Sequence, residues 1–240
     1  MTANEAFRQL RINSGYTYRA FAVQAGIPLS LLYGYESGGK EISSIPVAKA
    51  VRIFSLCGKS VVAFYLENYN LQQEVLQNME KWNREHPAEL HLDRLMTQLK
   101  NRIAKSRERK RLTEETALQL NKESNNIKGR LKDIITEDGC ISEKDYEQYV
   151  TPLMANIRAE MFCAPDNLPI ENRLIIDAKH KKNWGYSDLA EICGLSSHHL
   201  KYCLTGNGNL YSMHIGTALK LCIALGLEFP KVFKTLDDNK

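Results

Sequence analysis

The sequence lacks the features that mark membrane proteins and disulfide-stapled secreted proteins. No apolar run approaches the roughly 20 residues that a membrane-spanning helix needs. The six cysteines are scattered without a C-x-x-C pair, which argues against a zinc site or a disulfide framework and favours reduced thiols. The opening MTANEAFRQL has no basic region followed by an apolar stretch. We therefore expect a cytoplasmic protein without a secretory signal.

Patterns that carry catalysis or bind metals are also missing. The sequence holds no Gly-rich phosphate loop and no recognisable nucleophile–base–orienter set, so we expect neither an enzyme nor a cofactor. His198 and His199 are adjacent, and neighbours on a helix point about 100° apart, which suits shared metal ligation poorly. Asp138-Gly139 imitates part of a calcium loop. Placing Gly139 at the sixth loop position puts Ile134 where the first carboxylate belongs, so we expect no bound calcium.

The composition is that of an ordinary globular protein, and its charge is unevenly distributed. The 240 residues are 43% hydrophobic and 25% charged, with a net charge of +4. Residues 1–66 hold seven basic against three acidic side chains, residues 67–168 sixteen against eighteen, and residues 169–240 nine against seven. Both ends are basic and the middle is not, which favours a polyanionic partner at the ends.

The two ends of the chain repeat one another. A shift of 168 residues aligns residues 7–65 with residues 175–233 without a gap. The identical pairs are Tyr18/Tyr186, Ala22/Ala190, Gly26/Gly194, Leu32/Leu200, Gly38/Gly206, Ser44/Ser212, Ala50/Ala218 and Gly58/Gly226. These identities fall at expected turns and core positions, which indicates two copies of one structural module.

Each copy reads as five short helices. In the second copy we expect Gly194 to end a helix in the left-handed conformation and Ser196 to cap the next. Gly206 then closes the helix SHHLKYCL. In the first copy Pro28 stands where Ser196 stands, and proline suits the start of a helix because its missing N–H would be unbonded there.

The stretches TYRAFAVQAGIPLSLLYGYESG and GYSDLAEICGLSSHHLKYCLTG resemble the helix-turn-helix of the phage-repressor (Cro/C1, or XRE) family. The resemblance covers roughly residues 4–66 and 170–234. It implies an all-α fold with two five-helix Cro/C1-type domains, at residues 1–66 and 169–240. It also implies a sequence-specific transcriptional regulator of double-stranded DNA, from a bacterial or mobile-element operon.

In this family the second helix of the motif enters the major groove. Carried onto the second copy, this makes the outward side chains of that helix candidates for base contacts, and the Tyr186 hydroxyl a donor to phosphate. The basic run KHKK would contribute phosphate contacts through Lys181 and Lys182, or would form a solvated helix face. The outward residues of the second helix are Ser197, His198, Lys201 and Tyr202.

The first copy has fewer hydrogen-bonding groups on the equivalent helix. Its outward residues are Leu29, Ser30, Tyr33 and Gly34, of which only Ser30 and Tyr33 can hydrogen-bond through their side chains. The further DNA-contacting candidates of this copy are Tyr18, Arg19 and Lys40. We interpret the first copy either as a DNA-binding module with weak sequence discrimination or as one that offers Leu29 and Tyr33 to a protein partner.

Residues 67–168 are expected to form a helical linker. A helix should cover residues 67–86 and end before Pro87. From Leu92 to Ile134 the apolar positions alternate steps of four and three, as in the a/d seam of a coiled coil, but the middle of the seam is polar. A coiled-coil homodimer is the leading interpretation, and an intramolecular helical hairpin is the alternative. The polar run KSRERKR (105–111) would be a phosphate-contacting patch or a solvated helix face.

The remainder of the middle region is expected to fold back on the far end of this seam. Ser142 and Asp145 form a helix-capping pattern. The helix that follows, with Leu153 and Ile157, should fold back on Leu131, and residues 163–169 should link to the second copy.

Two classes of function remain open from the sequence. The first is the DNA-binding regulator, whose function needs no catalytic pattern. The second is a phage or mobile-element inhibitor of a host defence protein, in which the modules serve autoregulation or protein contacts.

Overall fold

The computed structural model describes residues 1–161 and 167–233. These residues form helices and no strand, which confirms the all-α expectation. None of the described helices is both long enough and apolar enough to cross a membrane. The chain divides into two compact units: residues 1–81, 169–175 and 186–240 form the first, and residues 82–168 and 176–185 the second.

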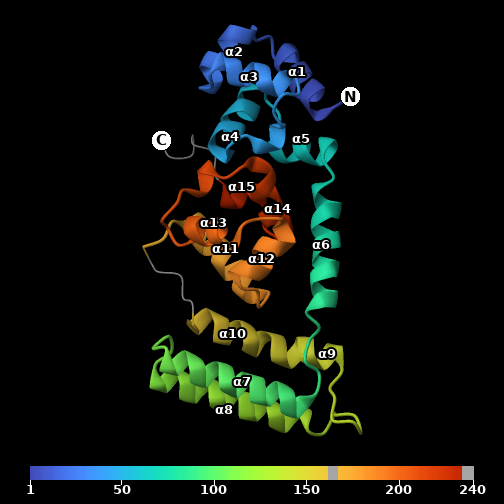
Figure 1. Ribbon diagram of the computed structural model, residues 1–240, viewed down its shortest axis with the longest axis vertical. Coiled ribbons are helices and arrows are strands. Elements are labelled where there is room, and N and C mark those ends of the chain that lie inside the picture. Colours follow the sequence, from blue (N-terminus) through green and yellow to red (C-terminus); the bar gives the residue numbers. More distant parts are fainter. Residues whose placement is uncertain (162–166, 234–240) are drawn as a thin grey trace. The chain divides into compact units, whose positions relative to one another are not determined.

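The two copies of the repeat contain the same elements in the same order (Figure 1). The first copy consists of α1 (Ala3–Asn13), α2 (Tyr18–Ala25), α3 (Leu29–Glu36), the 3₁₀ turn η1 (Ile42–Ser44), α4 (Val47–Leu56) and α5 (Val61–Asn68). The second consists of α11 (Ile170–Lys181), α12 (Tyr186–Cys193), α13 (Ser197–Leu204), η3 (Leu210–Ser212), α14 (Ile215–Leu225) and α15 (Phe229–Val232). The bounds of α2, α3 and η1 recur in α12, α13 and η3 after the 168-residue shift.

The backbone conformation repeats along with the elements. Gly26 and Gly194 have φ values of 66° and 67°, in the left-handed region that suits glycine. Asn183, at φ 56°, matches Gly15, at φ 73°. The same turn is therefore built with glycine in one copy and with asparagine, the residue most tolerant of this region, in the other.

The two copies fill their cores differently. The first uses aromatic rings: Phe7 lies 6.3 Å from Phe21 and 6.1 Å from Phe54, between ring centroids. The positions that match Phe7 and Phe21 in the second copy are Ile175 and Leu189, both fully buried. Because each core keeps its apolar positions while changing their shape, the repeat preserves its fold with few identical residues.

The middle region is built from α6 (Leu71–Glu85), α7 (Leu92–Glu108), α8 (Glu114–Leu131), α9 (Glu143–Asp145), the π-helical turn η2 (Tyr146–Val150) and α10 (Thr151–Met161). α7 and α8 pack side by side, and a salt bridge of 2.9 Å between Lys128 and Asp93 joins the end of α8 to the start of α7. The chain therefore reverses between them, at the polar middle of the predicted seam.

The reversal makes the seam the core of an intramolecular hairpin. Met96, Leu99 and Ile103 of α7 are buried together with Leu120 of α8. The described residues thus adopt the hairpin rather than one continuous rod. Pairing of two chains through the middle helices stays a prediction, and it would have to use other faces of these helices.

The helix after the hairpin follows its predicted path. The Asp145 N–H donates to the Ser142 hydroxyl at 3.1 Å, as the capping pattern indicates. Leu153 and Ile157 pack in the same core as Leu131. Ile134, which was expected in the seam, is exposed. The predicted linker at residues 163–169 lies largely outside the described residues.

Candidate nucleic-acid interface

Each copy presents two helices joined by a three-residue turn. In the first copy the Ile27 N–H donates to the Ala22 carbonyl at 3.0 Å, and in the second the Leu195 N–H donates to the Ala190 carbonyl at 2.7 Å. The small side chains of Ala22 and Ala190 are buried at these turns. The angle at which the second helix leaves the first is therefore fixed by the same backbone contact in both copies.

The outward face of α13 is polar. Leu200, Cys203 and Leu204 are buried, and the helix turns its other side chains to solvent. Ser196 caps the helix by accepting a hydrogen bond from the His199 N–H at 3.4 Å. The four candidates on this helix, Ser197, His198, Lys201 and Tyr202, are all exposed.

The outward face of α3 is largely apolar. Tyr33 is 66% exposed and Leu29 42% exposed, and Ser30 lies beside them on the exposed side of the helix. Val23 of α2 adds a third apolar side chain, 70% exposed. Val23 is not among the residues predicted from the sequence, although the repeat register pairs it with the charged residue Glu191 and so indicates an outward position.

The repeat register shows how the two faces differ. Val23, Leu29 and Tyr33 correspond to Glu191, Ser197 and Lys201. All six side chains are exposed. The same backbone positions therefore carry an apolar surface in the first copy and a polar one in the second.

The side chain of Tyr18 is hydrogen-bonded to the start of α3. Its hydroxyl donates to the Leu29 carbonyl at 3.3 Å, and the Arg11 guanidinium lies 5.3 Å from the ring centroid. Burial and the nearby Glu36 carboxylate raise the pKa of Tyr18. Tyr186, at the matching position of the second copy, is half-buried, and burial raises its pKa as well.

A largely buried ion pair joins α1 to α3 in the first copy. Arg11 donates through Nε to Glu36 Oε1 at 2.5 Å and through Nη2 to Glu36 Oε2 at 2.9 Å. Its Nη1 donates to the Tyr16 carbonyl at 3.0 Å. The hydrogen bond to Glu36 raises the pKa of Arg11, and this two-point contact joins α1 to α3.

The cations predicted for the first copy are exposed, and one of them has a defined position. Arg19 and Lys40 both face solvent. The Lys40 stem lies across Gly34, where an added Cβ would meet Lys40 Cγ at 3.3 Å. In the second copy Tyr202 stands at the position of Gly34, and Gly208 stands at the position of Lys40. There the Tyr202 ring lies across Gly208. One large side chain therefore fills this space in either copy.

Only the second half of the basic run at the end of α11 lies at the surface. Lys181 and Lys182 are exposed, but Lys179 is 1% exposed and His180 is buried. Lys179 Nζ donates to the Trp184 carbonyl at 3.2 Å, the counterpart of the bond from Arg11 to Tyr16. The run therefore exposes Lys181 and Lys182, the two residues expected to contact phosphates, and buries the two before them. Lys181 and Lys182 also belong to the second unit, and α13 to the first.

The two copies meet through a symmetric pair of backbone hydrogen bonds. The Val47 N–H donates to the Met213 carbonyl, and the Ile215 N–H donates to the Ile45 carbonyl, both at 2.8 Å. The 168-residue shift turns the first bond into the second. The junction thus has the reciprocal form of a two-fold dimer interface, within one chain.

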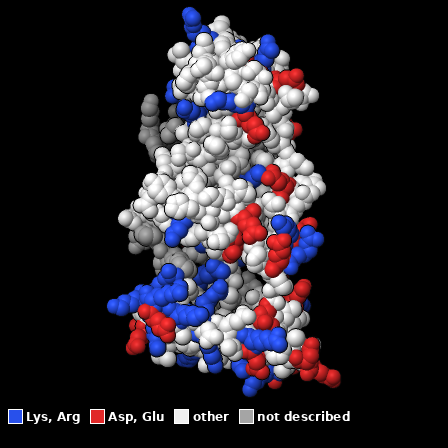
Figure 2. All heavy atoms as spheres, in the orientation of Figure 1, with Lys and Arg blue, Asp and Glu red and all other residues white. Residues whose placement is uncertain are grey.

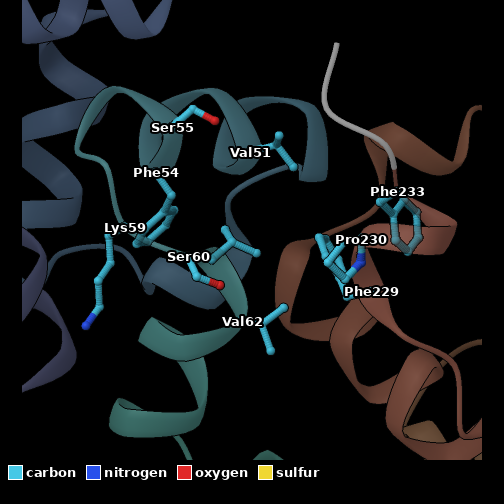
Figure 3. Close-up of a pocket in the computed structure, with 10 residues that line it drawn as sticks. Val51, Phe54, Ser55, Lys59, Ser60, Val62, Phe229, Pro230 and Phe233 are labelled. Atoms are coloured by element: carbon cyan, nitrogen blue, oxygen red, sulfur yellow. The ribbon is translucent and has the colours of Figure 1, made fainter. Parts of the chain in front are cut away.

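The junction is close on one side and open on another. Gly216 of α14 has no room for a side chain, since an added Cβ would lie 2.9 Å from Ser43 Cβ. A cavity of about 170 Å³ lies where α4 and α5 face α15 (Figure 3). Its lining is mainly apolar and includes Val51, Phe54, Val62, Phe229, Pro230 and Phe233.

No protein-family model, curated protein or solved structure matches this chain. The likeness to phage repressors therefore rests on the residues of the two motifs. Within the described residues, no group of three His, Cys, Asp or Glu side chains is placed to hold a metal ion.

Proposed function

We propose that this chain is a sequence-specific DNA-binding transcriptional regulator whose two modules act as the two halves of a dimer. The observation that carries the proposal is the reciprocal bond pair between residues 45–47 and 213–215. Regulators of the helix-turn-helix kind read two half-sites with two-fold related modules. A single chain with an internal two-fold junction supplies both modules without a second copy.

In this proposal the second module determines most of the base specificity. Lys201 can donate to the O6 and N7 acceptors of guanine, and Ser197 and His198 can hydrogen-bond to bases or phosphates. The first module offers Leu29 to a thymine methyl group and Ser30 to a base edge or phosphate. Exposed cations such as Arg19 and Lys40 supply the salt-dependent attraction to phosphates.

Unlike modules imply unlike half-sites. A homodimer reads a palindrome because its halves are identical, whereas here Tyr33 stands where Lys201 stands in the other copy. We expect an asymmetric operator with one strongly specified half-site. Its two half-sites should be centred about one helical turn, roughly 34–36 Å, apart.

Selection of bound fragments from random and genomic DNA, followed by a salt titration, tests the proposal. Lys201→Ala should weaken operator binding by about 5- to 150-fold, the range of a lost base contact, and relax the preference in one half-site. Tyr33→Ala should cost less than Lys201→Ala. Lys122→Ala, an exposed change in α8, is the control. Absence of DNA binding even at low salt would refute the proposal.

A second function has one observation in its favour, the exposed apolar surface of Val23, Leu29 and Tyr33. Such a surface suits a protein partner, as in an anti-defence inhibitor. Val23→Asp together with Leu29→Asp should then abolish partner binding. If DNA binding survives this change with its specificity intact, the apolar face serves a protein and the second module alone reads the operator.

A further inference from the structure

The basic run at the end of α7 surrounds a hollow. Arg102 and Lys105 of α7 line it together with Arg109 and Arg111 of the following turn, around a volume of about 380 Å³. Figure 2 shows Lys and Arg side chains gathered on this part of the second unit, with some acidic side chains beside them. Among the described residues that line the hollow there is no carboxylate. The hollow therefore suits an anion.

The backbone of this turn is held in an unusual conformation. Lys110 has φ 53°, a region that residues with a Cβ disfavour. The Lys110 N–H donates to the Arg107 carbonyl at 2.8 Å and the Arg111 N–H to the Ser106 carbonyl at 2.9 Å. This closes α7 as a glycine would, but with a lysine. The closure fixes where Arg109 and Arg111 leave the backbone, next to the cations of α7.

A second, less charged hollow adjoins the first. It has a volume of about 190 Å³, and it shares Gln98 and Arg102 with the basic one. Its other walls include Leu95, Met154 and the ring of Tyr146. Tyr146 is half-buried and begins the π-helical turn η2, a local distortion that is frequent at functional sites.

Arg102 stands at the boundary between the two hollows. Its Nη1 lies 3.5 Å from the sulfur of Met154, which lines the second hollow, while Arg102 itself lines both. An aromatic and thioether-lined space beside a cluster of cations matches a ligand with a planar ring at one end and several phosphates at the other. The combined space is in the range of small-molecule sites.

We propose that the second unit binds a nucleoside di- or triphosphate here, with the phosphates among Arg102, Lys105, Arg109 and Arg111 and the base against Tyr146. The convergence of the cations on one hollow favours a compact polyanion. A duplex backbone would instead need cations spread along its length. The proposal is independent of the DNA-binding function of the two modules.

Isothermal titration of the full-length protein with ATP and with inorganic tripolyphosphate tests the site. Lys105→Gln with Arg109→Gln should lower the affinity for both ligands by at least about tenfold, since two charge-assisted contacts are lost. Tyr146→Leu should lower the affinity for ATP only. Lys122→Gln with Arg130→Gln, which removes the same charges from the exposed face of α8, should change either affinity less than about twofold.

Three results would overturn the assignment. The first is the absence of saturable ATP binding at low salt. The second is an equal loss in both pairs of charge variants, which would show that only net charge matters. The third is displacement of ATP by duplex DNA together with an unchanged ATP affinity of Tyr146→Leu, which would make the hollow a nucleic-acid contact. Unfolding midpoints of all variants separate binding effects from misfolding.

Discussion

Asn172 and Asn4 occupy matched positions of the two copies and use their amides in the same way. Asn172 Nδ2 donates to the carbonyls of Cys203 and Leu204, at 2.8 and 3.1 Å. Asn4 Nδ2 donates to the carbonyl of Tyr35, which corresponds to Cys203. Carbonyls in the last turn of a helix have no partner within that helix. The two asparagines therefore close the C-terminal ends of α3 and α13.

Asn172→Ala should destabilise the protein by about 1–3 kcal/mol, because its two carbonyl partners are left unsatisfied in a buried site. Asn4→Ala should cost less, since Asn4 is half-exposed and water can replace its amide. Urea unfolding of both variants measures the difference. An equal or larger loss for Asn4→Ala would contradict the role of burial.

His180 makes stability depend on pH. Burial, together with the charges of Lys179 and Arg158, lowers the pKa of His180 to about 4. The unfolded chain has a histidine pKa near 6.5, so it binds the proton first as the pH falls. The stability contributed by neutral His180 is thus complete above about pH 6.5 and is lost as the pH falls towards 4.

The variant His180→Gln should lose this part of the pH dependence. As the pH is lowered from about 7 to about 4.5, the unfolding free energy of the wild type should fall relative to that of the variant. Urea titrations of both proteins at both pH values measure this difference. The contributions of the carboxylates, which both proteins share, cancel in it. A difference that stays constant across this range would contradict the buried neutral imidazole.

At the scale of elements, glycine has opposite effects in helix α8 and in the turn between α12 and α13. Gly129 lies inside α8 with no atom within 4 Å of an added Cβ. Gly129→Ala should therefore stabilise the protein by about 1 kcal/mol, the difference in helix propensity. Gly194 also has open space, but its φ of 67° disfavours any Cβ.

Gly194→Ala should consequently destabilise the protein by about 1–2 kcal/mol. Thermal unfolding of the two single variants, each against the wild type, gives both signs. Since neither site is crowded, a destabilising Gly129→Ala would mean that α8 is not a regular helix at this point.

At the scale of the whole molecule, the junction between the copies can be broken without breaking its helices. Val47 and Ile215 are the first residues of α4 and α14, where proline is tolerated. The residues before them, Pro46 and His214, have ψ values of 141° and 139°, which a following proline accepts. Val47→Pro with Ile215→Pro removes both junction hydrogen-bond donors.

This double variant should lose at least about 100-fold in operator affinity, because two modules no longer fixed to each other lose the advantage of linked binding. Each half-site should still be bound weakly, as measured on isolated half-site duplexes. Glu114→Pro, at the first position of α8, is the proline control. Helix content by circular dichroism shows whether the modules remain folded.

Gly216→Ala provides an independent route to the same result. The added methyl group meets Ser43, while alanine favours the helix it joins. A loss of operator affinity in this variant cannot come from a weaker α14. Full affinity in both junction variants would show that the two modules bind DNA independently of their contact.

The sequence by itself determined the repeat, its turns and its outward positions. A shift of 168 residues gives α2, α3 and η1 the same bounds as α12, α13 and η3, because apolar spacing, caps and left-handed glycines act within a few residues of the chain. It therefore placed Ser197, Lys201 and Tyr33 on exposed faces. These features are local, and local chemistry is readable from local sequence.

Only the tertiary structure decided which surfaces face one another. The heptad seam can pack against a partner chain or against a neighbouring helix. The chain reverses at the turn around Lys110, so α7 packs against α8 of the same chain. The burial of Lys179 and the reciprocal bonds of Val47 and Ile215 depend on residues distant in the chain. Apolar burial has no direction of its own, so the pattern that predicts a buried face does not name what covers it.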